Sequence, residues 1–240
     1  MRLKRMMQGM GLVYVLLLMG SIYPAFFKEN TVEAGNQEIS SPNAIAYVAE
    51  NIVEKPKIAI TFDDGPSTTY TPELLDGLKE RNVKATFFLI GENIEKNDNR
   101  EIVKRMYDEG HLIGNHTYHH VEITKVSNEE AYQEIVMTND VISSITGEDV
   151  QFMRPPFGLW QKELEQKIHV LPVMWSIDPL DWATENVDEI VNKVVTEAEE
   201  NDIILMHDCY DSSVKAALKI VDRLTKEGYE FVTVDELMLN

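Results

Sequence analysis

Short apolar runs alternate with amphipathic segments about seven times between residue 56 and the C-terminus, and this alternation constrains the fold more than any other feature. The runs that we interpret as strands are 57–62, 85–90, 112–115, 150–154, 170–176, 203–207 and 231–234. The helix-like segments between them lie near 72–81, 98–109, 128–146, 160–167, 187–200 and 213–227. Strands that alternate with helices in this way form a parallel sheet covered by helices. The number of repeats favours a (β/α) barrel over an open sheet.

Two of the helix-like segments begin with a capping signal. Ser127 is followed three residues later by Glu130, and Asn186 is followed three residues later by Glu189. In a capping box the first side chain accepts a hydrogen bond from a free backbone N–H of the first helical turn. We therefore expect helices to start at these two positions.

Polar side chains follow five of the expected strands at the point where each strand ends. They are Asp63 and Asp64; Asn115, His116 and His120; Arg154; Asp178, Asp181 and Trp182; and His207 and Asp208. In a barrel the carboxyl ends of the strands share one rim, and active sites lie at that rim. Solvated loops are a poor explanation for five such strand ends, so we predict a functional site there.

The first of these strand ends is an Asp-Asp-Gly-Pro sequence at 63–66. Alone, it would be a turn with an acidic edge, because Asp, Gly and Pro all favour turns. A bound cation would relieve the repulsion between the two carboxylates, but a cation needs further ligands. His116 and His120, four residues apart, are the candidates, and His119 and His111 are possible competitors.

A carboxylate from Asp64 would complete a site of two histidines and one carboxylate with open coordination positions. Such a site suits Zn²⁺ in hydrolysis and also Fe²⁺ in oxygen chemistry. Asp63 would remain free beside the cation, where it could take a proton from a water whose pKa the metal has lowered. We expect Arg154 to pair with Asp63.

Hydrolysis also needs an acid that protonates the leaving group from the other side of the site. His207 is the candidate for this role. A nearby carboxylate would raise the pKa of His207 and fix its tautomer. Asp178 and Asp208 are the two carboxylates that could do so.

The overall charge narrows the choice of partner. The chain of 240 residues has 41 acidic and 22 basic residues and a formal charge of −19, which argues against nucleic acid as a partner. Its single cysteine, Cys209, excludes an intrachain disulfide and is more simply a small packing residue than a nucleophile.

The N-terminus indicates export. Three basic residues among the first five precede an uncharged, largely apolar segment at 6–27. Its length lies between the apolar core of a signal peptide, about 7–15 residues, and a spanning helix of about 20. We expect 1–27 to be a signal-anchor or a signal peptide, 28–55 a linker, and 56–240 a catalytic domain outside the cytoplasm. The domain would be anchored to the membrane through its N-terminal segment, or secreted.

Five stretches of the chain resemble the motifs of the NodB-type polysaccharide deacetylases (carbohydrate esterase family 4), and they occur in the order of that family. They lie at 61–66, 116–120, 154–158, 178–182 and 205–208. The resemblance covers residue 56 to the C-terminus. It implies a deformed (β/α)7-type barrel and a metal-dependent amidase that removes acetyl groups from N-acetylglucosamine units.

The resemblance also implies a role for each residue of the metal side of the site. Asp64, His116 and His120 would hold the metal, which is usually zinc. Asp63 would be the general base, and Arg154 resembles the residue that tethers it. These assignments agree with those that the residues themselves suggest.

On the opposite side, His207 resembles the general acid, with Asp178 as its partner. The backbone N–H of Phe157 would help to bind the oxyanion, and Trp182 and Leu205 resemble the walls of the pocket for the acetyl methyl group. The third motif often has Tyr where this chain has Phe157, so a hydroxyl contact to the sugar would be missing.

The sequence therefore predicts a deacetylase that acts on cell-wall glycan, either peptidoglycan or a chitin-like oligosaccharide. An esterase for acetylxylan or another O-acetylated glycan is the alternative on the same scaffold. A non-haem iron oxygenase is an alternative of another class, but it would need neither the Asp63–Arg154 pair nor a carboxylate partner for His207. A glycan-binding protein with a relic metal site is a further alternative.

Overall fold

The computed structural model describes residues 54–238. The predicted signal segment at 1–27 and nearly all of the predicted linker at 28–55 lie outside this range, so both stay predictions. Among residues 54–238, no helix is both long and apolar enough to cross a membrane.

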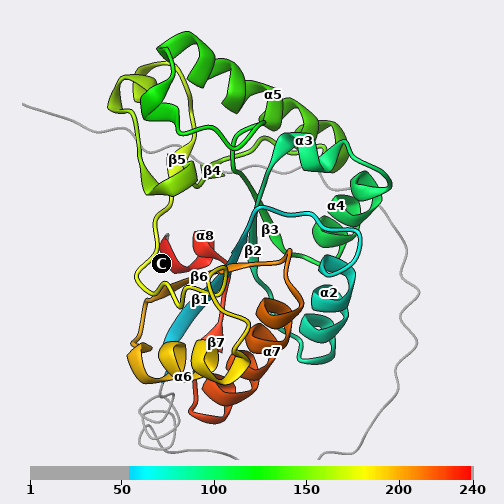
Figure 1. Ribbon diagram of the computed structural model, residues 1–240, viewed down its shortest axis with the longest axis vertical. Helices are drawn as coiled ribbons and strands as arrows, with labels where there is room; N and C mark the ends of the chain where they lie inside the picture. The colour runs from blue at the N-terminus through cyan, green and yellow to red at the C-terminus, as the bar shows by residue number, and fades with distance from the viewer. Residues whose placement is uncertain (1–53, 239–240) are drawn as a thin grey trace, which may run out of the picture. The chain divides into compact units, whose positions relative to one another are not determined.

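A parallel sheet forms the centre of the described domain (Figure 1). Its strands are β1 (Lys57–Asp63), β2 (Thr86–Leu89), β3 (Leu112–Asn115), β4 (Phe152–Met153), β5 (Leu171–Pro172), β6 (Ile203–His207) and β7 (Glu230–Phe231). They pair in the order β5-β4-β3-β2-β1-β6, and β7 pairs with the first two residues of β1. Neighbouring strands are all parallel, as the alternation of strands and helices predicts.

The longer helices are α2 (Thr71–Glu80), α4 (Asn99–Asp108), α5 (Asn128–Thr146), α6 (Val187–Glu197) and α7 (Asp211–Lys226). The short ones are α3 (Gly91–Ile94), α8 (Val234–Met238) and the 3₁₀ helices η1 (Ile123–Lys125), η2 (Pro156–Gly158) and η3 (Lys162–Gln166). The helix expected near 160–167 is therefore a 3₁₀ turn. In space α6 packs on α7, α7 on α2, α2 on α4 and α4 on α5, so these helices cover the outer face of the sheet in the order of its strands.

The expected helix starts are confirmed. Ser127 Oγ accepts a hydrogen bond from the Glu130 N–H at 3.2 Å, and Asn186 Oδ1 accepts one from the Glu189 N–H at 3.3 Å. These caps fix where α5 and α6 leave the preceding loops, because they satisfy backbone donors that have no partner within the helix.

The two faces of β1 have different neighbours, because successive side chains of a strand point to opposite sides. Its outward residues Ile58, Ile60 and Phe62 lie in the main apolar core with residues of the covering helices. On the inward face, Ala59 packs in a separate cluster with Phe88 of β2. Thr61 and Asp63 are two and four residues after Ala59, so their side chains point to the same inward face. Strand β1 therefore places Asp63 on the inner side of the rim.

The sheet curls so that the chain beyond β5 reaches β6 on the far edge. The expected strand at 170–176 is not continuous: Leu171–Pro172 pairs with β4, and Ile177 then forms an isolated bridge with Ile204. The N–H of Leu205 donates to the Ile177 carbonyl at 2.9 Å. The predicted deformed barrel is thereby confirmed as a curled parallel sheet, closed on this side by a bridge instead of a strand pair.

Candidate metal centre and active site

The loop after β1 is held in one conformation by contacts on both sides. Asp64 has φ 72°, in the left-handed region that L-residues rarely adopt. Asn93 Nδ2 donates to the Asp64 carbonyl at 2.8 Å. The next residue must be glycine, because a Cβ on Gly65 would lie 2.4 Å from Asp208 Oδ1. This loop therefore fixes the direction of the Asp64 side chain.

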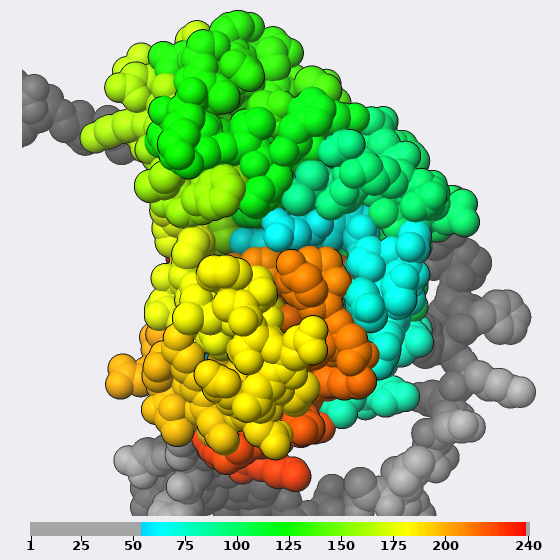
Figure 2. Space-filling view, viewed as in Figure 1, coloured from blue at the N-terminus to red at the C-terminus, as the bar shows by residue number. Residues whose placement is uncertain are grey.

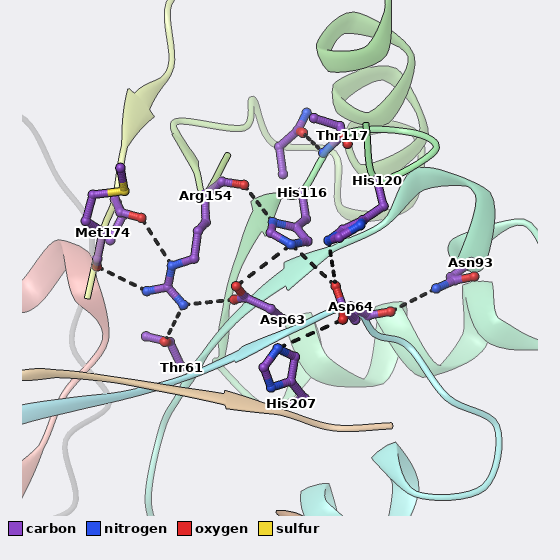
Figure 3. Close-up of polar contacts among 12 residues, drawn as sticks. Thr61, Asp63, Asp64, Asn93, His116, Thr117, His120, Arg154, Met174 and His207 are labelled. Atoms are coloured by element: carbon purple, nitrogen blue, oxygen red, sulfur yellow. Dashed lines mark hydrogen bonds and ion pairs between the residues drawn. The ribbon is translucent and has the colours of Figure 1, made fainter. Parts of the chain in front are cut away.

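Asp64, His116 and His120 come together as the sequence predicts (Figure 3). Asp64 Oδ1 lies 3.4 Å from His116 Nε2 and 3.3 Å from His120 Nε2, and the three possible ligand atoms all lie within 4.8 Å of one another. Asp64 Oδ1 is buried and has no hydrogen-bond partner. A buried carboxylate oxygen without a partner is unfavourable, and a cation between these atoms would satisfy it.

The ring of His116 is oriented for ligation. Its Nδ1 lies 2.6 Å from the carbonyl oxygen of Arg154. A carbonyl can only accept, so Nδ1 carries a hydrogen, and in the neutral imidazole the lone pair is on Nε2, which faces Asp64. Metal-binding histidines commonly have this arrangement. The residues therefore fit a metal ion with nitrogen and oxygen ligands.

Neither competing histidine joins this group. His119 Nδ1 lies 2.7 Å from Glu134 Oε1, and its side chain is about half exposed. His111 precedes β3, at the end of the strand opposite the rim, where its Nδ1 accepts from the Ala85 N–H at 3.1 Å. Among residues 54–238, the group of side chains that could hold a metal ion thus consists of the three predicted residues.

Charge on Asp64 is favoured by its surroundings. Burial raises the pKa of the Asp64 carboxyl, but the three neighbouring imidazoles outweigh burial and hold this pKa below its usual value. The pKa of His120 is lowered, chiefly by burial and then by the charge of His116. A carboxylate that is ionised and an imidazole that is neutral are the forms that bind metals.

Arg154 lies fully buried beneath the rim and holds Asp63, as predicted. Its Nη1 lies 2.8 Å from Asp63 Oδ1. The other donors of the guanidinium go to Thr61 Oγ1 at 2.6 Å, the Val173 carbonyl at 3.1 Å and the Met174 carbonyl at 3.3 Å. The second carboxylate oxygen of Asp63 lies 3.8 Å from His116 Nε2. Asp63 is not part of the group that could hold a metal ion, so it is fixed beside the candidate metal site.

His207 faces Asp64 from the opposite side, with its Nε2 4.0 Å from Asp64 Oδ2 (Figure 3). Its partner is Asp181: His207 Nδ1 lies 2.9 Å from Asp181 Oδ1, and the His207 N–H donates to Asp181 Oδ2 at 2.9 Å. Burial lowers the pKa of His207, but the Asp181 hydrogen bond and charge outweigh it and raise this pKa to about 9.

The predicted pairing of His207 with Asp178 was wrong, and so was the alternative with Asp208. Asp178 Oδ1 instead accepts from the Leu180 N–H at 2.9 Å and closes a turn within its own loop. Asp208 is fully buried, where Thr71 Oγ1 donates to its carboxylate. Burial raises the pKa of Asp208 to about 7. Asp181 lies within the same motif, three residues after Asp178 and directly after Leu180, which has φ 59°.

A pocket of about 430 Å³ opens over these groups. It is lined by Asp63, Asp64, His116, His120, Pro155, Phe157, Trp175, Asp178, Trp182, Leu205, His207 and Tyr210. In Figure 2 the cyan chain after β1 lies at the bottom of a recess between green segments above it and an orange segment below it. Every residue to which the family resemblance assigns a role lines this pocket except Arg154, which lies beneath Asp63.

The predicted substrate-binding residues form the walls of the pocket. The side chains of Phe157 and Trp182 are exposed, whereas Leu205 is buried. Phe157 has φ 61° and its ring stands edge-on against His120, with ring centroids 5.0 Å apart. Sequence reasoning missed Tyr210, which lines the same pocket; its only signal is its place three residues after His207, between β6 and α7.

Comparisons with known proteins find related sequences and related structures. A family model for polysaccharide deacetylase matches residues 50–174. The peptidoglycan-N-acetylglucosamine deacetylase PgdA of Listeria monocytogenes is 40% identical over 181 residues, which are 75% of this chain but 38% of that protein. The chain thus spans well under half the length of this relative.

Two solved structures extend the comparison to the fold. The peptidoglycan deacetylase PdaC from Bacillus subtilis is 38% identical, with a TM-score of 0.74 over 77% of this chain and 90% of that one. A family 4 acetyl xylan esterase from Clostridium thermocellum, solved in complex with a cobalt ion, is 32% identical, with a TM-score of 0.71 over 76% and 90% of the two chains.

Proposed function

The chain belongs to the polysaccharide deacetylase family, and we propose that it is a metal-dependent hydrolase that removes N-acetyl groups from cell-wall glycan. The substrate that we favour is the N-acetylglucosamine of peptidoglycan, because relatives with about 40% identity are named for it. A chitin-like oligosaccharide offers the same acetamido group.

One arrangement carries this proposal. Three ligand atoms lie within 4.8 Å of one another at the bottom of a pocket, with Asp63 on one side and His207 on the other. An amide is a poor electrophile with a poor leaving group. Its hydrolysis therefore needs an activated water, a stabilised oxyanion and a proton donor for the amine, and the residues around this pocket can supply each of them.

We propose that Asp64, His116 and His120 hold Zn²⁺. Two imidazoles and one carboxylate with open positions make a usual donor set for catalytic zinc. When bound, the zinc would supply Lewis-acid activation of a water and of the amide carbonyl. Asp63 would take the proton of that water, and the buried Arg154 would keep the Asp63 carboxylate in place.

His207 would donate a proton to the amine nitrogen as the amine leaves. Its pKa of about 9 keeps the imidazole protonated at neutral pH, and the bond from Nδ1 to Asp181 leaves the Nε2 proton directed at the pocket. Water then adds to the carbonyl carbon, the C–N bond breaks, and acetate and a free amine are released. The Phe157 N–H would bind the oxyanion, and Trp182 and Leu205 would enclose the acetyl methyl group.

We further propose that the enzyme acts outside the cytoplasm, held by its N-terminal segment or released from it. The basic residues before an apolar stretch support export, and the names of the peptidoglycan-deacetylating relatives agree with a cell-wall substrate. An esterase for acetylxylan is the second candidate, because an acetyl xylan esterase shares the fold at 32% identity.

The test is release of acetate by the full chain, loaded with Zn²⁺, from peptidoglycan, chitooligosaccharide and acetylxylan. We expect acetate from peptidoglycan together with an equal amount of new free amine, and loss of both after chelation. Acetate from acetylxylan alone, without free amine, would support the esterase instead. No acetate from any of the three glycans would overturn the proposal.

A further inference from the structure

Glu134 of α5 is a buried carboxylate that the proposed chemistry does not use. Only 7% of the residue is exposed. Its Oε2 accepts hydrogen bonds from the backbone N–H groups of Tyr118 at 3.0 Å and His119 at 2.7 Å, and its Oε1 lies 2.7 Å from His119 Nδ1. All of these contacts go to the loop between His116 and His120, the two proposed metal ligands.

This loop has a backbone that needs external support. Thr117 has φ 62° and His120 has φ 56°. Side chains with a Cβ avoid this left-handed region, because the Cβ approaches the following carbonyl oxygen. A loop without restraint would leave this conformation, and His120 Nε2 would then move away from its place 3.3 Å from Asp64 Oδ1.

Other contacts hold the loop mainly through its carbonyl groups, since the N–H of Glu92 in α3 donates to the Tyr118 carbonyl at 2.9 Å. Asn115 Oδ1 accepts from the Thr117 N–H at 2.7 Å, while its Nδ2 donates to the Ile135 carbonyl of α5 at 2.8 Å. The N–H of Gly91 in α3 donates to the Thr117 carbonyl at 3.0 Å. Glu134 is the acidic side chain that takes the two consecutive N–H groups directly before His120.

We propose that Glu134 is a positioning residue for the metal centre, which fixes the backbone at Tyr118 and His119 so that His120 meets Asp64 and His116. The inference rests on the proposed metal site. Glu134 contacts the loop and not the ligand atoms, so it acts through His120. Partners that orient metal ligands typically change metal affinity about 10- to 100-fold when they are removed.

The test compares the Zn²⁺ affinity of variants of the full chain by competition with a chromophoric chelator. Glu134→Ala should raise the dissociation constant about 10- to 100-fold. Glu134→Gln should recover most of the affinity, because its amide oxygen can still accept both N–H groups. His119→Ala, which removes only the side-chain contact, should stay close to wild type. Glu130→Ala is the matched control, since Glu130 is an exposed acid of the same helix.

Two further measurements separate positioning from general stability. Affinities are measured well below the unfolding temperature of each metal-free variant, so that unfolded protein does not contribute. Amide hydrogen exchange of Tyr118 and His119 in metal-free protein should become faster in Glu134→Ala and stay unchanged in Glu130→Ala.

Wild-type affinity in Glu134→Ala would overturn the role of Glu134, and so would a Glu134→Gln variant as weak as Glu134→Ala. These failures differ from a failure of the proposed function, in which wild-type protein itself would bind no zinc.

Discussion

The ends of β3 and β6 each present a histidine to Asp64. In both histidines Nε2 faces Asp64, but the group that contacts Nδ1 differs. At the end of β3, His116 Nδ1 lies against the neutral carbonyl oxygen of Arg154. At the end of β6, His207 Nδ1 lies against the carboxylate of Asp181. Both partners fix the ring and its tautomer, but only the carboxylate also stabilises a positive charge on the imidazole.

This difference explains how one residue type can serve two roles a few ångströms apart. A carbonyl partner leaves His116 with a lone pair on Nε2, which suits a metal ligand. A carboxylate partner raises the pKa of His207 to about 9, which suits a proton donor. The comparison therefore predicts that substitutions on the two sides will have separable effects on metal content, on turnover and on pH dependence.

The largest effect is expected on the β3 side. His116→Ala removes one of the three proposed ligands, so both zinc and activity should be lost, and acetate release should fall to background. Zinc content after dialysis, measured by atomic absorption, checks the cause. His119→Ala is the matched control on the same loop and should retain its zinc. Retention of zinc by His116→Ala would contradict its role as a ligand.

On the β6 side, His207→Ala should lower kcat about 10²- to 10⁴-fold, the usual contribution of a general acid, while zinc content stays equal to wild type. Parallel measurement of kcat and bound zinc tests this separation. Loss of zinc from His207→Ala would mean that His207 is a metal ligand and not the general acid.

The sequence could predict that the proposed metal ligands come together, because their positions follow from topology. Asp64 follows β1 and His116 follows β3, and the carboxyl ends of parallel strands must share a rim. The starts of α5 and α6 were equally predictable, since Ser127 and Asn186 carry their caps in the local sequence. Local signals and chain connectivity suffice for these features.

The partner of His207 could not be predicted in the same way. Asp178 and Asp181 lie in one motif, and the choice between them depends on a turn in which Leu180 has φ 59° and donates to Asp178. Glu134 is a stronger case, because an acid within an amphipathic helix gives no sign that it faces a loop 15 residues away in sequence. Such contacts are decided by tertiary packing.

A smaller effect should follow from removing the charge that distinguishes the two histidines. In wild type, His207 remains protonated below its raised pKa, so kcat/KM should fall as pH rises through about 9. Asp181→Asn removes the main contribution that raises this pKa and leaves the opposing effect of burial. The alkaline limb should therefore move to lower pH, by about 1–3 units.

The pH profile of kcat/KM measures this shift, and Asp178→Asn is its matched control. Asp178 lines the same pocket, but its carboxylate oxygen accepts from the Leu180 N–H, a bond that an amide oxygen can also accept. The alkaline limb of Asp178→Asn should stay where it is in wild type. An alkaline limb that moves in Asp178→Asn and not in Asp181→Asn would mean that Asp178, and not Asp181, raises the pKa of His207.

The smallest effect is expected from the aromatic walls, which extend the comparison from the two histidines to the substrate. Phe157 stands against His120, whereas Tyr210 follows His207 and lines the pocket from the β6 side. Neither residue is a proposed metal ligand, base or acid. Tyr210→Ala should therefore raise KM without changing the zinc content or the alkaline limb of the pH profile. If the contact with the sugar contributes as much as a pair of aromatic rings does, about 0.5–1.5 kcal/mol, its loss corresponds to roughly a two- to tenfold rise in KM. Initial rates on a soluble chitooligosaccharide measure it. A fall in kcat at constant KM would instead place Tyr210 with His207 in the chemistry of the β6 side.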